Sequence, residues 1–409
     1  MIKEKQFLFR NLFLLSCLWI SLFSSSITKG KAAIRPEGTY GPSYTSSGGI
    51  HIAGLTGNNK MIYDNDWFYD IIDAGYLVAK HKLGQLELRG IIVTADFFYG
   101  NGRIQGSIDD FTDFRNNAIT AGLTTVPNYT AGANAMLSRP GNGNISETSF
   151  TRTAGSDLIV AEARLCTPEN PLVVCVGGPA TTVATALLQD PSIEDNIVVL
   201  MCDLTDYNNK DTWAIYVVSK RTRFFAYPFI LNHGYSDAVW NQLPKNVFCD
   251  HFHTSLVKQN AVGDGALLAW FFNNSMVKNV QKKTMTAAND WTNASSSPYG
   301  FLYIEKSTSN FDGAAMCQQM VNTLKDPNVY IQIPALPAVS VVASHASAGE
   351  LSNNGEFTFS VSTAFSVNTT INDTVSSTAT NGIEYSTIAT SVVLTSWQTS
   401  VKVPLLPKP

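Results

Sequence analysis

The sequence is poor in charge and lacks the short motifs that mark several enzyme classes. Of its 409 residues, 15% are charged, and the formal net charge at pH 7 is -4. This balance gives no electrostatic basis for binding nucleic acid, and no basic run would attract the chain to an anionic membrane. A G-x-S-x-G nucleophile elbow and a P-loop are also absent from the sequence. The 44% of hydrophobic residues is nevertheless that of a globular protein, and the length allows two or three domains.

Cysteine is scarce and widely spaced. The sequence has six cysteines. The five that follow the N-terminal segment are Cys166, Cys175, Cys202, Cys249 and Cys317. An odd number at wide spacing, with no C-x-x-C pair, predicts neither a disulfide framework nor a zinc site. Cys175 and Cys202 stand within apolar runs, which predicts thiols packed in the core.

The first 33 residues have the arrangement of residue types that is typical of a secretory signal peptide. Basic residues precede an apolar run over residues 12–23, and serines and alanines follow it. That run is short for a segment that spans a membrane. We therefore predict a signal peptide over residues 1–33, no stable membrane insertion, and a secreted, periplasmic or cell-surface protein.

From residue 34 to residue 335, apolar runs alternate with helical patterns. We predict strands at residues 61–66, 88–95, 171–176, 196–201 and 224–226. We predict helices at residues 70–83, 111–121, 157–165, 181–188, 212–219 and 266–272. Near-continuous apolar strands that alternate with helices indicate a mostly parallel open sheet with helices on both faces. Ligands of such folds bind beyond the carboxyl ends of the strands, where Asp66, Asp96 and Gly177 would lie.

The stretch from residue 61 to residue 77 carries several aspartates close together. They are Asp64, Asp66, Asp70 and Asp73. A strand end followed by a helix start places these carboxylates at the mouth of a sheet, and Asp70 and Asp73 would share one helix face. Crowded carboxylates repel one another unless a cation compensates them, and oxygen ligands suit Ca²⁺ or Mg²⁺. The alternative is structural, because Asp is also a common N-cap.

The pattern changes after Pro334. Prolines at positions 334 and 337 mark a linker, and helical patterns end there. Period-two segments then occur at residues 339–343, 357–361, 392–394 and 401–403. Ser, Thr and Asn fill the gaps between these segments. The alternation predicts a small β-sandwich over residues 336–409.

Three sequence blocks together resemble the nucleoside hydrolase family, the inosine/uridine-preferring N-ribohydrolases. The blocks are residues 64–66 (DND) with 73–77 (DAGYL), residues 176–181 (VGGPAT) and residues 261–266 (AVGDGA). They follow the order of the family's motifs and cover roughly Lys60 to Lys278. The resemblance implies that residues 34–335 form a hydrolase domain that separates the base from a nucleoside.

The resemblance also implies a Ca²⁺ site and its ligands. Asp66, Asp73 and Asp264 would bind the ion through carboxylates, and Val176 would bind it through its backbone carbonyl. Asp66 would also act as the general base on a calcium-bound water. That water attacks the anomeric carbon through an oxocarbenium-like transition state. The implied partner is a small-molecule substrate, a nucleoside or a related glycoside.

Several positions depart from the family pattern. Ile72 stands where the family has an Asp that helps to hold ribose, and Asp70 is a nearby substitute. Asp96 replaces the usual Asn after the second strand. Trp213 falls in a segment, residues 212–214, where the family has Glu-Phe-Asn. We predict Asp70, Asp96 and Trp213 as substrate-binding positions. The departures favour an alternative, a non-catalytic surface protein that keeps the fold and binds carbohydrate.

Other residues near these blocks allow more than one interpretation. The aromatic residues around Trp67 and Phe97 could stack on a base or a sugar, or could equally be core. Asn209 and Asp211 are candidate replacements for the polar side chains missing from residues 212–214. His251 and His253 would share a face if their segment were a strand, but the sequence suggests no third metal ligand.

The C-terminal segment resembles a Calx-beta domain. The resemblance rests on residues 339–341, 355–359 and 377–385. Such domains can bind Ca²⁺ through acidic side chains at one end of the sandwich, and Glu350 and Glu384 fit two of those places. The family's closing Asp-Asp segment is missing from the sequence. We therefore expect a domain that is shortened by one strand.

Overall fold

The computed structural model describes most of the chain from residue 52 onward. The described residues are 52–67, 71–97, 101–202, 211–227, 237–252, 265–288, 290–293, 301–305, 307, 309–331, 338–349, 353–365, 367–374 and 380–408, with the backbone of short paired strands β1 (Tyr44–Thr45) and β2 (Gly49–Ile50). They divide into two compact units, within Lys29–Gln332 and within Ile333–Pro409. The predicted site residues Asp70, Asp264 and Glu350, and the candidate Asn209, lie outside the described residues.

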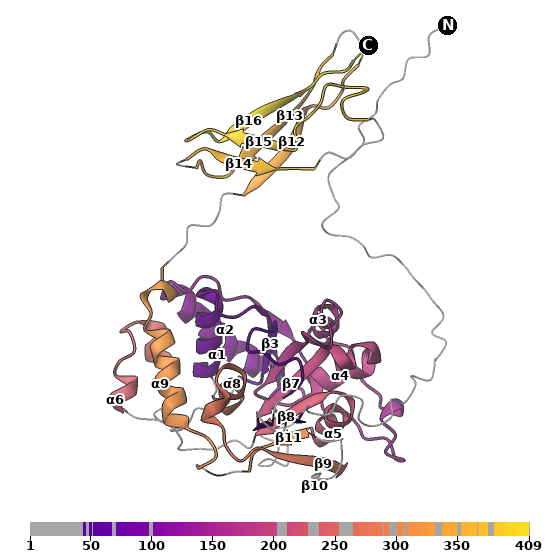
Figure 1. The fold of residues 1–409 in the computed structure, drawn as a ribbon, viewed down its shortest axis with the longest axis vertical. Coiled ribbons are helices and arrows are strands. Elements are labelled where there is room, and N and C mark those ends of the chain that lie inside the picture. Colours follow the sequence, from indigo (N-terminus) through magenta and orange to yellow (C-terminus); the bar gives the residue numbers. More distant parts are fainter. Residues whose placement is uncertain are drawn as a thin grey trace. The chain divides into compact units, whose positions relative to one another are not determined.

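In the described part of the larger unit, nine strands form one sheet in the order β10-β9-β11-β8-β7-β6-β3-β4-β5 (Figure 1). Their bounds are β3 Met61–Asn65, β4 Leu88–Val93, β5 Tyr129–Ala131, β6 Leu172–Val176, β7 Ile197–Cys202, β8 Arg223–Tyr227, β9 Gln281–Ala287, β10 Asp290–Asn293 and β11 Phe301–Tyr303. The strands from β11 to β5 pair in parallel, and β9 and β10 add an antiparallel edge. The predicted mostly parallel sheet is confirmed.

Helices cover both faces of this sheet. One apolar layer includes α1 (Ile71–Lys82), α2 (Ile104–Thr120), α6 (Asp237–Trp240), α8 (Gly265–Phe272) and α9 (Gly313–Leu324), and the other includes α3 (Ala154–Ala163), α4 (Thr181–Gln189) and α5 (Thr212–Arg221). Short 3-10 helices are η2 (Ile145–Glu147), η3 (Pro191–Asn196), η4 (Asn274–Met276) and η5 (Pro327–Val329). Met61 and Tyr63 of β3 face the first layer and Ile62 faces the second. A strand that is apolar on both faces needs helices packed on both faces of the sheet, as predicted.

Most of the predicted elements exist, with shifted ends. Gly84 follows α1 with a φ of +69°, the left-handed conformation that closes a helix. Strand β5 was not predicted, because its three half-buried residues are too few to give a periodic signal. Helix α9, which follows the predicted helix at 266–272, was also not predicted. Among the described helices, none has the length and apolarity needed to cross a bilayer.

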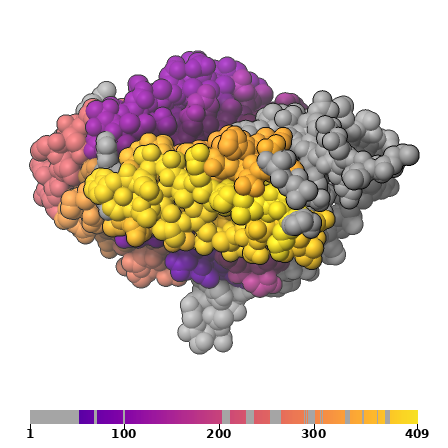
Figure 2. All heavy atoms as spheres, turned by 90° about the horizontal axis from the view of Figure 1, so that it is seen from above, coloured from indigo at the N-terminus to yellow at the C-terminus, as the bar shows by residue number. Residues whose placement is uncertain are grey.

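The smaller unit contains two antiparallel sheets. Strands β12 (Val339–His345), β13 (Gly355–Val361) and β16 (Ser400–Leu405) form one sheet in the order β12-β13-β16, and β14 (Thr369–Asn372) pairs with β15 (Ser391–Leu394) in the other. Strands β12, β13, β15 and β16 contain the predicted period-two segments, and β14 was not predicted. Phe359 and Leu394, one from each sheet, are buried. The described atoms of this unit are coloured from orange to yellow in Figure 2.

Candidate functional site

The order of the strands reverses between β3 and β6. The chain runs outward from β3 through β4 and β5, then returns to place β6 on the other side of β3 and continues through β7 and β8. In open α/β sheets, ligands bind at such a switch point, beyond the carboxyl ends of the strands. Asp66 follows β3, and Gly177 and Gly178 follow β6. The topology therefore brings two of the sequence blocks to the expected binding position.

Asp66 and the turn after β6 are in close contact. Asp64 pairs with Val176 between the strands, and the Gly177 N–H donates to the Asp64 carbonyl oxygen at 2.9 Å. A Cβ atom added to Gly178 would lie 2.9 Å from the Asp66 nitrogen and 3.0 Å from its Cβ and Cγ. This turn therefore needs glycine because its backbone packs directly on Asp66. The predicted ligands Asp66 and Val176 come from adjoining strand ends.

Asp64 is fully buried, and a chain of hydroxyl groups reaches its carboxylate. Thr94 Oγ1 donates to Asp64 Oδ1 at 2.5 Å, and the Thr94 and Thr182 hydroxyl oxygens are 2.7 Å apart. Because the proton of Thr94 is committed to Asp64, Thr182 is the donor of the second bond. The Ala133 N–H donates to Thr182 Oγ1 at 2.9 Å. Asp64 Oδ2 has no hydrogen-bond partner among the described residues.

The environment of Asp64 disfavours its charge. Burial raises its pKa to about 7, and the charge of Asp66 adds to this rise, while the hydrogen bond from Thr94 and the nearby Thr182 hydroxyl lower the pKa. Asp66 is itself buried. Neighbouring buried carboxylates with an oxygen left unbonded fit a site that a cation completes. Because the donors are oxygens, the site suits a hard cation.

Asp73 lies in the first turn of α1 and is fully buried. A carboxylate there is favoured by the helix dipole. Burial raises the pKa of the Cys317 thiol on α9, and the charge of Asp73 raises this pKa further, so the two side chains lie near each other. Within the described ranges, no group of three or more Asp, Glu, His or Cys side chains could hold a metal ion. The predicted ligand Asp264 lies outside those ranges, so the complete ligand set stays a prediction.

Two of the predicted substrate-binding residues, Asp96 and Trp213, have different surroundings. Asp96 follows β4 and is half-buried. Trp213 of α5 is 3% exposed, and its Nε1–H donates to Thr148 Oγ1 at 2.9 Å. Its ring stacks on Tyr216 with centroids 5.1 Å apart, and the Arg139 guanidinium lies 5.5 Å from its centroid. The indole is thus held by the protein, and its contact with substrate stays a prediction.

Asp211 connects three segments near the switch point. As the N-cap of α5, it accepts the Ala214 N–H at 3.0 Å through Oδ1. Its Oδ2 accepts the Leu137 N–H at 2.6 Å and the Thr181 hydroxyl at 2.9 Å. Burial raises its pKa, and these hydrogen bonds oppose the rise. Its position directly before a helical pattern is the sequence signal for this capping role.

Trp67, directly after Asp66, has an unusual backbone conformation. Its φ is +63°, which is uncommon for a residue other than glycine. Its ring is 2% exposed and lies 4.8 Å from Phe111 and 5.1 Å from Phe114 between centroids. Phe97 is also buried. Trp67 and Phe97 are therefore core residues, and the backbone strain beside Asp66 is of the kind that occurs at functional sites.

Other candidate residues have structural surroundings. Cys175 and Cys202 are buried in the core, as predicted. Residues 247–252 are helical, so His251 does not lie on a strand, and His253 lies outside the described residues. Glu384 is exposed in the smaller unit, and one of its carboxylate oxygens accepts the Thr380 N–H. A second calcium site stays a prediction.

The molecule is an α/β protein with buried carboxylates at the switch point of a mostly parallel sheet. No family model and no curated protein matches its sequence. Among solved structures it is similar to an inosine-guanosine nucleoside hydrolase (14% identity, TM-score 0.48, 65% of this chain and 98% of that chain). It is also similar to the inosine-uridine preferring nucleoside hydrolase from Bacillus anthracis (11% identity, TM-score 0.42, 65% of this chain and 99% of that chain). The similarity to a nucleoside hydrolase-related protein from Saccharophagus degradans covers more of the chain (14% identity, TM-score 0.46, 86% of this chain and 92% of that chain).

The contact between Gly178 and Asp66 can be tested by adding one methyl group. Gly178→Ala is expected to lower the free energy of unfolding by about 1–3 kcal/mol, because the new Cβ must displace the Asp66 backbone. Gly141→Ala is the matched control, since nothing lies within 4 Å of a Cβ there. Urea unfolding of both variants measures the difference. Equal stability of the two variants would show that the turn does not pack on Asp66.

Proposed function

We propose that the protein is a calcium-dependent hydrolase that cleaves the N-glycosidic bond of a nucleoside or a related glycoside. The observation that carries the proposal is the contact of Asp66 with Gly178 at the switch point of the sheet. It brings together two sequence blocks, residues 64–66 and 176–181, that resemble the nucleoside hydrolases and lie far apart in the chain. The buried, incompletely hydrogen-bonded carboxylate of Asp64 supports a cation at the same place.

Each residue has a defined role in this proposal. Asp66, Asp73, Asp264 and the Val176 carbonyl would hold the ion. When bound, Ca²⁺ would lower the pKa of a coordinated water and align the sugar hydroxyls. Asp66 would accept a proton from the attacking water while the bond between the anomeric carbon and the base nitrogen breaks. The hydroxyl chain that ends on Asp64 fixes the strand end from which Asp66 projects.

The proposal extends to the ends of the chain. We propose that residues 1–33 are a cleaved signal peptide and that the protein acts outside the cell, in the periplasm or on the cell surface. The order of basic, apolar and small residues in that segment supports this. We also propose that residues 336–409 form a Calx-beta-like domain, supported by its two antiparallel sheets.

The test is hydrolysis with and without calcium. Free base and reducing sugar are both measured after incubation with a panel of purine and pyrimidine nucleosides. We expect both products to appear in equal amounts, to disappear with a calcium chelator and to return when Ca²⁺ is restored. Calcium binding without turnover of any substrate in the panel would contradict a hydrolase.

The second candidate is a carbohydrate-binding protein without catalysis, and one observation favours it. The family position that helps to hold ribose is occupied here by Ile72, which is 0% exposed and belongs to the apolar core. A buried isoleucine contributes no hydrogen bond to a sugar. Binding of sugars in the absence of any turnover would favour this function over the first.

A further inference from the structure

A pocket lies apart from the proposed metal ligands. It has a volume of about 620 Å³ and is bordered by residues 132–138 after β5, by residues 149–151 and Thr153 before α3, and by the start of α4. This volume is within the roughly 300–1,000 Å³ of small-molecule sites. None of the predicted metal ligands lines it. It is close to the switch point, because a Cβ on Gly132 would lie 2.4 Å from Thr94 Oγ1 and 2.6 Å from Thr182 Oγ1.

The lining of this pocket is polar but uncharged. No Asp, Glu, Lys, Arg or His is among the described residues that border it. The hydroxyl-bearing side chains are Ser138, Ser149, Thr151, Thr153, Thr181 and Thr185, and Asn101 and Asn134 add amides. Hydroxyl and amide groups can both donate and accept, so they can match the hydroxyl groups of a sugar. A phosphate or carboxylate ligand would find no compensating cation there.

Phe150 supplies an apolar surface at this pocket. Its side chain is 37% exposed, and it is the one aromatic residue among the described residues that line the pocket. Met136 and Leu137 add further apolar surface. A single exposed ring offers one flat face, which suits the C–H face of a sugar. The combination of one aromatic face with many neutral polar groups favours a sugar over a planar base.

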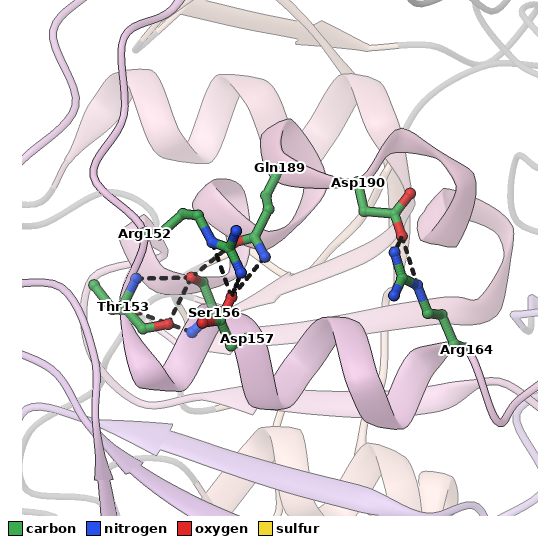
Figure 3. A network of polar contacts seen from close by, with 7 residues as sticks. All are labelled: Arg152, Thr153, Ser156, Asp157, Arg164, Gln189 and Asp190. Atoms are coloured by element: carbon green, nitrogen blue, oxygen red, sulfur yellow. Dashed lines mark hydrogen bonds and ion pairs between the residues drawn. The ribbon is translucent and has the colours of Figure 1, made fainter. Parts of the chain in front are cut away.

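A polar network fixes one wall of the pocket (Figure 3). Thr153 and Ser156 form a capping box at the start of α3, with both hydrogen bonds at 3.0 Å. The Arg152 guanidinium is 2.7 Å from Asp157 Oδ1, and Gln189 Nε2 donates to the same oxygen at 2.6 Å. Ser156 Oγ also donates to Gln189 Oε1 at 3.1 Å. These contacts connect the wall to α3 and to the end of α4.

The buried Asp211 fixes other parts of the lining. Its Oδ2 accepts hydrogen bonds from the Leu137 N–H and the Thr181 hydroxyl, which belong to two different segments of the pocket. Pocket walls that are fixed before binding lose little conformational entropy when the ligand enters. The pocket is therefore preorganised.

We propose that this pocket binds an uncharged sugar ring, with Phe150 against the apolar face of the sugar and the hydroxyl and amide side chains around its edge. The site does not depend on the hydrolase reaction, since the proposed metal ligands and Asp66 take no part in its lining. It would serve either a sugar-containing substrate that extends from the switch point or a separate saccharide.

The experiment is calorimetric titration of the full-length protein in a calcium chelator. The probes are D-ribose, D-glucose and cellobiose, with adenine and uracil as the base arm and glucose 6-phosphate as the charged arm. We expect at least one neutral sugar to bind and Phe150→Ala to weaken that binding roughly tenfold. Thr151→Val, at an exposed position of the lining, is expected to weaken it about two- to tenfold. Leu165→Ala is the control, an exposed apolar residue outside the pocket, and should bind as the unchanged protein does.

Three results with the neutral sugars or the bases would overturn the inference. They are no binding of any neutral sugar, equal binding by Phe150→Ala and the unchanged protein, or Phe150-dependent binding of the bases alone. Preferred binding of the phosphorylated sugar would also overturn it, because the lining offers no cation. The chelator removes the turnover expected of the proposed hydrolase. The titration can therefore fail while hydrolysis is observed with calcium, and it can succeed where no hydrolysis occurs.

Discussion

Replacing Asp66 by asparagine is expected to lower the turnover of nucleosides by roughly 10²–10⁴-fold, the usual contribution of a general base. Asparagine has the same shape as aspartate, so the contact with the Gly178 turn is kept. Its amide cannot accept a proton from the attacking water. The measurement is kcat at saturating substrate and calcium, with circular dichroism and the unfolding midpoint to show that the fold is retained.

The control for this variant removes a carboxylate elsewhere. Asp109 is exposed on α2 and accepts a hydrogen bond from Gln105 Nε2 on the same helix. Asp109→Asn is expected to keep turnover within about twofold, since effects of exposed substitutions are small. If Asp66→Asn turned over substrate as fast as Asp109→Asn, Asp66 would have no part in the mechanism.

Replacing Asp64 by asparagine is expected to stabilise the calcium-free protein at pH 8. Burial raises the pKa of Asp64 from 3.8 to about 7. Between these values the folded state keeps a proton that the unfolded state releases, so the free energy of unfolding falls as pH rises from about 4 to 7 and stays low above it. The whole shift corresponds to about 4 kcal/mol. Asparagine stays neutral and can still accept the Thr94 hydrogen bond, so it avoids this loss.

Unfolding by urea at pH 4.5, 6 and 8, in a chelator, measures the effect. Asp157 provides a control of opposite sign. Burial raises its pKa, but hydrogen bonds from Arg152 and Gln189 outweigh this and leave the pKa below its ordinary value. Asp157→Asn should therefore lose stability above pH 4, where the aspartate is charged in both states. A flat pH profile of the unchanged protein, or an Asp64→Asn variant less stable at pH 8, would contradict the buried, uncompensated carboxyl group.

The larger elements of the fold were predictable because their apolar runs are long. Strands β6 and β7 are buried on both faces, so their sequences are apolar at nearly every position. Strand β5 spans three half-buried residues and gave no such signal. The antiparallel strand β9 is mostly half-buried with several polar residues, which resembles a loop in the sequence. These elements are defined by their pairing, and pairing partners cannot be read from local periodicity.

The sequence allowed the residues of the candidate site to be predicted, but not most of the contacts between them. The blocks around Asp66 and Gly178 could be recognised, but their contact depends on the return of the chain from β5 to β6. The hydrogen bonds of Asp64 involve Thr94 and Thr182, which belong to other segments and carry no motif. Aromatic residues such as Trp67 have the same composition whether they form core or a ligand surface, and only the fold distinguishes the two.

The most direct test of the proposed metal site is a crystal structure determined with calcium. We expect one ion whose oxygen ligands, at the roughly 2.3–2.6 Å typical of Ca²⁺, come from Asp66, Asp73, Asp264 and the Val176 carbonyl. An ion bound elsewhere, or three carboxylates directed to three separate places, would contradict the site and the hydrolase proposed from it.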